Sequence, residues 1–407
     1  MSIFSLPGIP NIHSHAFQRA MAGLAERQSE RHDSFWTWRE LMYRFAGRIT
    51  PESLHAIAAQ LFVEMLQSGY TSVCEFHYLH HQADGRPYDD QAATSAALIT
   101  AARETGIRLT LLPVLYMTGG FDGRPLSERQ RRFGHSVQSF LSLLDRLDRE
   151  QGPLLQVGAA LHSLRAVPAD AMGELLSASS MRSGRPIHIH ISEQLAEVSE
   201  CIELRGARPV QWLLDNAAVD EKWTLVHATH LDETEVEAIA RSGAVVALCP
   251  TTEANLGDGL FPLRDFLKQG GRFGIGSDSN ISVSPIEELR WLEYGQRLGS
   301  MRRNIASTTQ LPSTGESLLL QSVAGGSQAN GQGVQADDYL TLDQESLSLA
   351  AAAAADVHDR FVFAGNRSLV KDVFVAGAKV IDNGCHAKGE EIARRYRHAL
   401  RGLLADG

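Results

Sequence analysis

The sequence predicts an α/β protein built on a (β/α)8 barrel, with a small β-sandwich formed by its terminal segments. Three observations support this prediction. Short apolar runs recur along the chain, segments with helical periodicity separate them, and the pattern changes after about residue 330. Continuous apolar strands that alternate with helices are typical of a parallel sheet covered on both faces. Eight such units in roughly 280 residues favour a closed barrel over an open sheet.

The predicted barrel strands are the apolar runs at residues 8–15, 71–78, 107–116, 154–163, 185–192, 223–230, 244–250 and 272–279. Helical periodicity is clearest at residues 51–69 and 232–243. The second of these segments has acidic residues in its first turn and ends at a glycine, as a helix should. We therefore expect a barrel that spans residues 8–330.

Beyond the barrel, residues 333–343 and 372–384 indicate short strands, and Asp382-Asn383-Gly384 predicts a hairpin turn. The alanine tract at 350–355 is expected to be helical or a plain linker. Residues 331–385, together with 1–7, are expected to form the small β-domain. Residues 386–407 are expected to form a basic helix whose alternating charges make a solvated face.

Composition excludes several classes of function. The 407 residues are 43% hydrophobic and 21% charged, which is typical of a globular protein, and a net charge of -10 argues against nucleic-acid binding. The four cysteines form no CxxC pair, which suits a reducing compartment. No apolar run approaches the roughly 20 residues that span a bilayer, and the N-terminus does not resemble a signal peptide. We expect a cytoplasmic enzyme without a membrane partner.

Ionisable side chains recur at the C-terminal ends of the predicted strands, where barrel enzymes place their active sites. Alternate residues of a strand share a face, so two histidines in a His-x-His pair can converge on one ion. Polar groups gathered at one barrel mouth are costly to bury unless something pairs them. In chain order the residues are His13 and His15, His188, His190 and Glu193, His227 and His230, and Asp278.

Each of these residues also has an ordinary structural interpretation. An isolated His-x-His pair is often chance or packing, either His188 or His190 could be a hydrogen-bonded core residue, and Asp278 could cap a helix. Their joint placement favours a metal site. Three imidazoles and one carboxylate suit one divalent ion such as Zn²⁺ or Fe²⁺ and leave a position for water, which such an ion acidifies. No phosphate loop or Ser-His-Asp elbow competes with water as the nucleophile.

Longer stretches carry a resemblance to a known family. His13-x-His15, His190-x-x-Glu193, His227 and Asp278 resemble the mononuclear deaminase branch of the amidohydrolase superfamily. Over nearly the whole predicted barrel, the chain resembles the formimidoylglutamate deiminase family more closely. The segments that carry this resemblance are NIHSHAFQRAMAGL, FWTWRELMY, SGYTSVCEFHYLHH, LHSLRAVP, HIHISEQ, CPTTEANLGDG and GIGSDSNIS. The resemblance implies a homodimeric, zinc-dependent enzyme of histidine degradation that hydrolyses N-formimino-L-glutamate to N-formyl-L-glutamate and ammonia.

The resemblance also implies roles for individual residues. The zinc ligands would be His13, His15, His190 and Asp278, which selects His190 over His188. Asp278 would also accept a proton from the attacking water. Glu193 would carry a proton to the imino nitrogen, a kind of help worth roughly 10²–10⁴-fold in rate. His227 would orient the water or stabilise the developing charge.

A substrate with two carboxylates requires cations and hydroxyls at some distance from the metal. A guanidinium binds a carboxylate through two parallel hydrogen bonds, which suits Arg165 after the fourth predicted strand. By itself, an arginine after a strand is more often a surface or salt-bridging residue, and Arg39, beside Trp36 and Trp38, could mark a dimer contact. The resemblance favours substrate binding by Gln18, Arg39, Tyr78, His162 and Arg165.

One departure and two rival interpretations stand beside this prediction. Family members usually begin with several dozen residues of the β-sandwich, whereas this chain starts almost at the first barrel strand. We therefore expect strands near 334–342 and 372–381 to lack partners, leaving an incomplete sandwich with an exposed edge. A deaminase or chlorohydrolase acting on a nucleobase or triazine would share the metal site but not the carboxylate-binding set. A metal-binding but inactive homologue would be the other alternative, against which Glu193, His227 and Asp278 argue.

Overall fold

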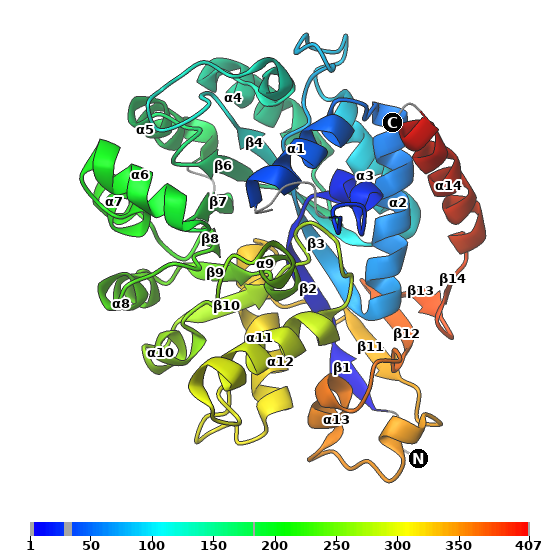
Figure 1. Ribbon diagram of the computed structural model, residues 1–407. Helices are drawn as coiled ribbons and strands as arrows, with labels where there is room; N and C mark the ends of the chain where they lie inside the picture. Colours follow the sequence, from blue (N-terminus) through cyan, green and yellow to red (C-terminus); the bar gives the residue numbers. More distant parts are fainter. Residues whose placement is uncertain (1–3, 28–34, 182–183, 406–407) are drawn as a thin grey trace.

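A closed barrel of parallel strands, ringed by helices, forms the centre of the computed structural model, which describes residues 4–27, 35–181 and 184–405 (Figure 1). Hydrogen bonding follows chain order around the barrel, and the last strand closes on the first. The prediction of a barrel is therefore confirmed, and each predicted run contains a strand. The barrel strands are β2 (Ile9–Ser14), β3 (Tyr70–His77), β4 (Arg108–Leu115), β5 (Leu155–Val157), β6 (Ala159–Ser163), β7 (Ile187–Ile191), β8 (Trp223–His227), β9 (Val245–Leu248) and β10 (Arg272–Ile275).

The run at 154–163 is broken into β5 and β6 at Gly158. Both pieces pair with β4. A Cβ atom at Gly158 would lie 2.4 Å from the Leu112 side chain and 3.0 Å from the Pro186 carbonyl oxygen. A side chain there would push against Leu112 and Pro186, so the break is a point of close approach that favours glycine.

Helices connect successive strands on the outside of the barrel. The predicted helix at 51–69 begins after Thr50, which forms a capping box with Ser53, and ends at Gly69 with φ 106°. The helix at 232–243 is capped by Asp232 and ends at Gly243 with φ 79°. The helices are α1 (Phe35–Ala46), α2 (Pro51–Ser68), α3 (Ala93–Thr105), α4 (Val137–Leu147), α5 (Ala169–Ser177), α6 (Leu195–Arg205), α7 (Pro209–Asn216), α8 (Glu233–Ser242), α9 (Pro250–Leu256), α10 (Leu263–Lys268), α11 (Pro285–Ser300) and α12 (Thr314–Ala329). Short 3-10 turns lie at Ala16–Met21, Glu128–Phe133, Asp148–Glu150 and Ser179–Met181.

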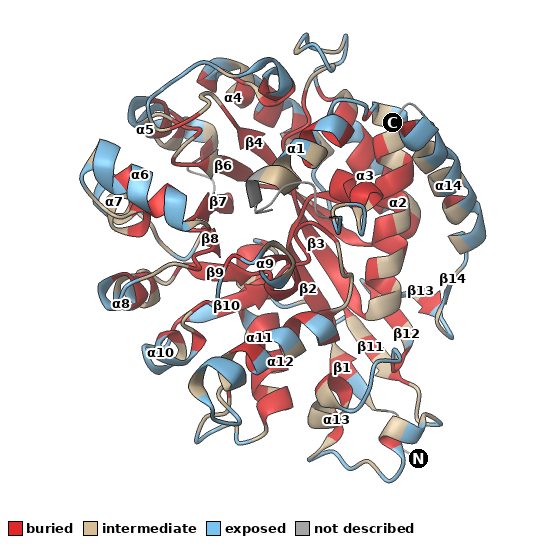
Figure 2. Cartoon of the chain, in the orientation of Figure 1, coloured by how far each residue is buried: buried red, intermediate tan, exposed pale blue. Residues whose placement is uncertain are grey.

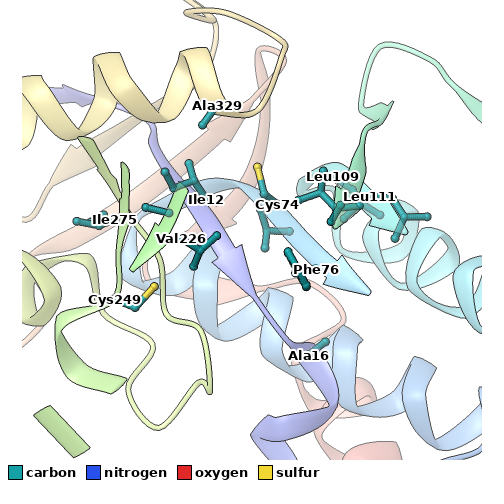
Figure 3. Packing of buried hydrophobic residues seen from close by; sticks show 14 of the residues in the cluster. Ile12, Ala16, Cys74, Phe76, Leu109, Leu111, Val226, Cys249, Ile275 and Ala329 are labelled. Carbon is teal, nitrogen blue, oxygen red and sulfur yellow. The ribbon is translucent and has the colours of Figure 1, made fainter. Parts of the chain in front are cut away.

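The barrel strands are buried on both faces, which explains their continuous apolar sequence. Figure 2 shows the strands almost wholly buried and the outward faces of helices such as α6 exposed. Ile12, Leu109, Val226 and Ile275 are 0% exposed and lie in the packed interior shown in Figure 3. Burying each large apolar side chain stabilises the fold by about 1.5–3 kcal/mol. The resulting rigid barrel holds the strand ends in fixed positions.

A separate antiparallel sheet joins the two ends of the described chain, in the order β1 (Ser5–Pro7), β11 (Tyr339–Leu342), β12 (Val370–Val375), β13 (Ala378–Asp382) and β14 (Cys385–His386). Because β1 pairs with β11, the expectation that the later strands lack partners is wrong (Figure 1). The predicted hairpin is confirmed, since Asn383 and Gly384 have φ 48° and 76° between β13 and β14. A second such turn at Ala376 and Gly377, with φ 50° and 75°, was not predicted.

The remaining segments pack against the barrel helices. The alanine tract is irregular, a linker between a 3-10 turn (Leu347–Leu349) and α13 (Val357–Phe363). The last helix, α14 (Gly389–Ala405), lies along α2 (Figure 1), and Arg395 reaches both carboxylate oxygens of Glu104 at 2.6 Å. Its basic face is therefore partly engaged in contacts. No helix among the described residues is long and apolar enough to cross a membrane.

Candidate metal-dependent active site

Histidines from three strand ends and one aspartate meet at the C-terminal mouth of the barrel. His13 and His15 come from the end of β2, His190 from β7, and Asp278 follows β10. His13 Nε2 lies 3.1 Å from His190 Nε2, and the Nε2 atoms of His13 and His15 each lie 3.3 Å from Asp278 Oδ1. His227 at the end of β8 joins them, since ligand atoms of His13, His190, His227 and Asp278 all lie within 4.8 Å of one another. The structure thus brings together all four residues predicted as ligands.

The imidazoles are held with lone pairs directed into this cluster. His15 Nδ1 lies 2.9 Å from the Phe76 carbonyl oxygen, and His190 Nδ1 lies 2.9 Å from that of His162. Because a carbonyl only accepts, each Nδ1 carries a proton and each neutral ring presents an unprotonated Nε2. Burial lowers the pKa of His13 to about 3 and that of His190 well below its usual value, which keeps these rings neutral. The unprotonated Nε2 atoms of His15 and His190 therefore suit a cation.

Asp278 supplies the negative charge. Burial alone would raise its pKa, but the hydrogen bond with His13 and the surrounding imidazoles outweigh burial and hold the pKa below its usual range. Its backbone is locked to the first strand, because its N–H donates to the His13 carbonyl at 2.9 Å and its carbonyl accepts from His15 at 3.0 Å. The helix-cap alternative does not apply, since the next helix, α11, is capped by Ser284.

His188 and His190 differ in their position along β7. His188 Nε2 hydrogen-bonds the carbonyl oxygen of Ala329, at the end of α12, at 3.0 Å. Two residues along a strand are about 6.6 Å apart, so only the second histidine reaches the barrel mouth. His188 is therefore a core residue. His230 lies beyond β8, close to Gly259, and is not part of the cluster.

Backbone strain is concentrated at the same mouth. Non-glycine residues with φ between 44° and 66° there are Ser192, His227, Ala228, Asp278 and Asn280. Each such conformation costs of order 1–3 kcal/mol and persists only where the surrounding structure enforces it. The enforcing contacts include Asn280, whose side chain donates to the carbonyls of His15 at 3.1 Å and Asp278 at 3.0 Å. This support by Asn280 was missed from the sequence.

Glu193 and His227 face the cluster from one side. His227 Nε2 lies 3.9 Å from Glu193 Oε1 and 3.9 Å from Asp278 Oδ2. Burial raises the pKa of Glu193, and this effect outweighs the nearby His227 and Arg165, which lower it. Burial would lower the pKa of His227, but the neighbouring carboxylates, Glu193 foremost, raise it to about 10. A carboxyl group and an imidazole thus stand together beside the cluster.

A cavity opens over the cluster, and every predicted substrate-binding residue lines it. Gln18 Nε2 donates to the Tyr78 hydroxyl at 2.9 Å. Within the described parts of the chain, the buried Nε of Arg165 has no hydrogen-bond partner, so the cavity contains a guanidinium nitrogen that an anion could engage. The lining comprises His15, Gln18, Trp38, Arg39, Met42, Tyr43, Tyr78, Tyr116, Phe133, His162, Arg165, His190, Glu193, His227, Leu256 and Asp278.

Some lining residues were not predicted from the sequence. Tyr116 packs against His162 with ring centroids 4.4 Å apart and the rings tilted by 57°, and its hydroxyl accepts from Gln130 Nε2 at 2.9 Å. It follows β4 directly, so the strand-end rule could have found it. Trp38, like Arg39, lines the cavity, whereas the side chain of Trp36 lies outside the described residues.

Comparisons with known sequences agree with this geometry. The model of the amidohydrolase family matches residues 4–312. The formimidoylglutamate deiminase of Pseudomonas aeruginosa is 52% identical over 98% of this chain and 89% of its own length. The 8-oxoguanine deaminase of the same species is 27% identical over 98% of this chain and 87% of its own length.

Solved structures give the same result. A crystal structure of an amidohydrolase from Brucella melitensis has a TM-score of 0.93 and 44% identity, covering 98% of this chain and 90% of that one. A zinc-bound adenosine deaminase from Xanthomonas campestris has a TM-score of 0.80 at 20% identity, covers 98% of this chain and 86% of that one, and shares the fold. With the family model spanning the barrel and a relative of more than half identity spanning nearly the whole chain, this protein belongs to the amidohydrolase family.

Proposed function

We propose that this protein hydrolyses N-formimino-L-glutamate to N-formyl-L-glutamate and ammonia. The observation that carries the proposal is the cavity in which Arg39 and Arg165 lie over the histidine–aspartate cluster. Identity of 52% to a formimidoylglutamate deiminase over nearly the full length supports the same reaction. Water adds to the formimino carbon, the bond to the imino nitrogen breaks, and that nitrogen leaves as ammonia.

The two carboxylates of the substrate would be held by guanidinium groups and hydroxyls. Burial would lower the pKa of Arg165, but Glu197 and Glu193 raise it, so the group stays charged and ready for an anion. We assign Arg165 and Arg39 to carboxylate binding, because a planar guanidinium matches a carboxylate with two parallel bonds. Gln18, Tyr78 and His162 would orient the rest of the substrate by hydrogen bonds.

We assign His13, His15, His190 and Asp278 as the ligands of one divalent ion, Zn²⁺ in preference to Fe²⁺. The neutral imidazoles and the single ionised carboxylate form a donor set that suits such an ion. When bound, a divalent ion of this kind lowers the pKa of a coordinated water toward 7. The carbonyls of Phe76 and His162 would keep two of the imidazoles oriented toward the ion.

The protein's own residues would move the protons. Asp278 Oδ2, which points toward His227, would accept the proton of the attacking water. Glu193 would pass a proton to the imino nitrogen, so that neutral ammonia leaves rather than an amide anion. His227, whose Nε2 faces both carboxylates, would stabilise the negative charge that develops as water adds.

A nucleobase deaminase is the rival that the comparisons keep in view, through the 27% identical 8-oxoguanine deaminase. A nucleobase has no carboxylate that a planar guanidinium could bind through two parallel hydrogen bonds, so it would leave that recognition unused. An inactive homologue is disfavoured because Glu193, His227 and Asp278 all face the cavity.

Ammonia release from N-formimino-L-glutamate tests the proposal, with Zn²⁺-loaded and chelated protein in parallel and 8-oxoguanine as the competing substrate. Metal-dependent release from the formimino substrate alone is the expected result. Release from 8-oxoguanine alone, or none from folded, metal-loaded protein, would refute it.

We further propose, from the sequence, that the protein is a cytoplasmic homodimer that acts in histidine degradation. The proposed domain divisions lie at residues 330 and 385. Sedimentation velocity would measure whether the protein is a dimer.

A further inference from the structure

Glu253 is a buried carboxylate that lies behind the cluster and is absent from the residues predicted from the sequence. It is the central residue of the short helix α9 and is 5% exposed. Its Oε1 atom lies 3.3 Å from His227 Nδ1 and accepts from the backbone N–H of Cys249 at 3.0 Å. It does not line the cavity, so it acts on a substrate only through another residue.

We propose that Glu253 is a positioning residue, which keeps a proton on Nδ1 of His227 and thereby directs Nε2 toward the reacting groups. Glu253 Oε1 already acts as an acceptor toward the Cys249 N–H, so His227 Nδ1, which faces the same oxygen, is the donor. With Nδ1 occupied by its proton, only Nε2 exchanges protons or hydrogen bonds with the cavity. The inference rests on the proposed function, because it explains why the ring of His227, which has a role in the proposed reaction, is fixed in one orientation.

The geometry at His227 makes this assistance necessary. Nε2 must stand between Glu193 Oε1 and Asp278 Oδ2, which both lie 3.9 Å away. The residue ends β8 in a strained conformation with φ 66°, which orients the backbone but leaves the ring free to rotate about its last torsion. A rotated ring would exchange the two nitrogens and place a different atom in the cavity. The Glu253 contact selects one of the two orientations.

A purely structural interpretation of Glu253 can be separated by experiment. Its bond to Cys249, the residue that caps α9, also stabilises the start of that helix. Glu288 offers a matched control, because it caps the same helix by accepting from the backbone N–H of Thr251 at 2.9 Å and from its hydroxyl. Glu288 is 0% exposed and is not part of the cavity lining. Loss of either carboxylate weakens the start of α9, but only one of the two contacts His227.

Steady-state kinetics of metal-loaded Glu253→Ala, Glu253→Gln and Glu288→Ala provide the first readout. We expect Glu253→Ala to lower kcat by about 10–100-fold, the usual effect of removing a residue that orients an imidazole, with KM within about threefold. Glu253→Gln keeps an accepting oxygen and is expected to stay within about fivefold of wild type. Glu288→Ala should keep wild-type kcat and lose thermal stability.

Proton NMR of the holoenzyme provides a readout that needs no turnover. The downfield Nδ1 proton of His227, assigned by its loss in His227→Gln, should be present in wild type and Glu288→Ala and absent in Glu253→Ala. The inference is overturned if this proton persists in Glu253→Ala, if that variant keeps wild-type kcat, or if both alanine variants lose kcat equally. Absence of ammonia release from wild type would instead refute the proposed function, and the NMR result would still judge the positioning role.

Discussion

Replacing Glu193 with glutamine tests the proposed proton transfer most directly. The side chain is 6% exposed and its carboxyl faces the cluster, while its backbone N–H is held by Glu197 at 3.1 Å. Glutamine has the same size and leaves that backbone contact in place, but it cannot carry a proton to a leaving nitrogen. Since none of the four proposed ligands changes, the variant should bind metal as wild type does.

The size of the effect depends on whether another group can deliver the proton instead. His227 Nε2 is 3.9 Å from Glu193 Oε1, beyond hydrogen-bonding distance, so it does not replace the Glu193 carboxyl at its own position. Because burial excludes bulk water as a substitute donor, the loss should lie within the 10²–10⁴-fold range of general acid–base catalysis. We expect kcat to fall about 10³-fold, which corresponds to a rise of about 4 kcal/mol in the activation free energy of the reaction.

The assay is ammonia release under saturating N-formimino-L-glutamate, with metal content measured on the same samples. Asp258→Asn is the matched control. Asp258 is a buried carboxyl that does not line the cavity, and its Oδ1 accepts from Gln194 Nε2, a hydrogen bond that the asparagine oxygen can keep. The control should keep wild-type turnover. Turnover of Glu193→Gln within about threefold of wild type, at equal metal content, would remove Glu193 from the mechanism.

Three further predictions concern binding, acid stability and the join between barrel and sheet. Arg165→Met should raise KM for N-formimino-L-glutamate by about 10–100-fold with unchanged metal content, because a charge-assisted bond of about 1.5–3 kcal/mol is lost; an unchanged KM would exclude Arg165 from carboxylate binding. Burial lowers the pKa of His77 and of His135 from 6.5 to about 3. Between pH 3 and pH 6.5 these two histidines bind protons only in the unfolded chain. The free energy of unfolding therefore has its full value above pH 6.5 and falls as the pH drops, by about 2 kcal/mol per histidine at pH 5. Urea unfolding at pH 7.5 and pH 5 measures this loss of stability, and His135→Gln should remove the share that His135 contributes. A pH dependence identical to that of wild type in this variant would contradict the role given to His135. The Asp338 carboxylate accepts from Arg108 at 2.6 and 3.0 Å, and both side chains are buried. Asp338→Ala would leave the arginine buried without this partner, so it should lower the free energy of unfolding by about 3–5 kcal/mol in thermal or urea unfolding. A loss below about 1 kcal/mol would contradict this prediction.

Local chemistry explains why so much of the fold could be predicted. Strand positions follow from apolar runs that are buried on both faces, and these patterns need no knowledge of partners. Helix ends follow from side chains that satisfy their own backbone, as at Thr50 and Asp232. The Asn383-Gly384 turn requires two residues with positive φ, and the sequence offers them. Each of these signals acts within a few residues.

The side chains that gather at the barrel mouth could also be predicted, because barrel topology places every strand end on one rim. Their individual contacts could not be predicted and became known from the folded chain. It placed His188 against Ala329 and His190 in the cluster, paired β1 with β11, and set Glu253 behind His227. The physical reason is that these contacts join segments separated by tens or hundreds of residues, so their distances depend on how the strands close and the helices pack rather than on any local preference.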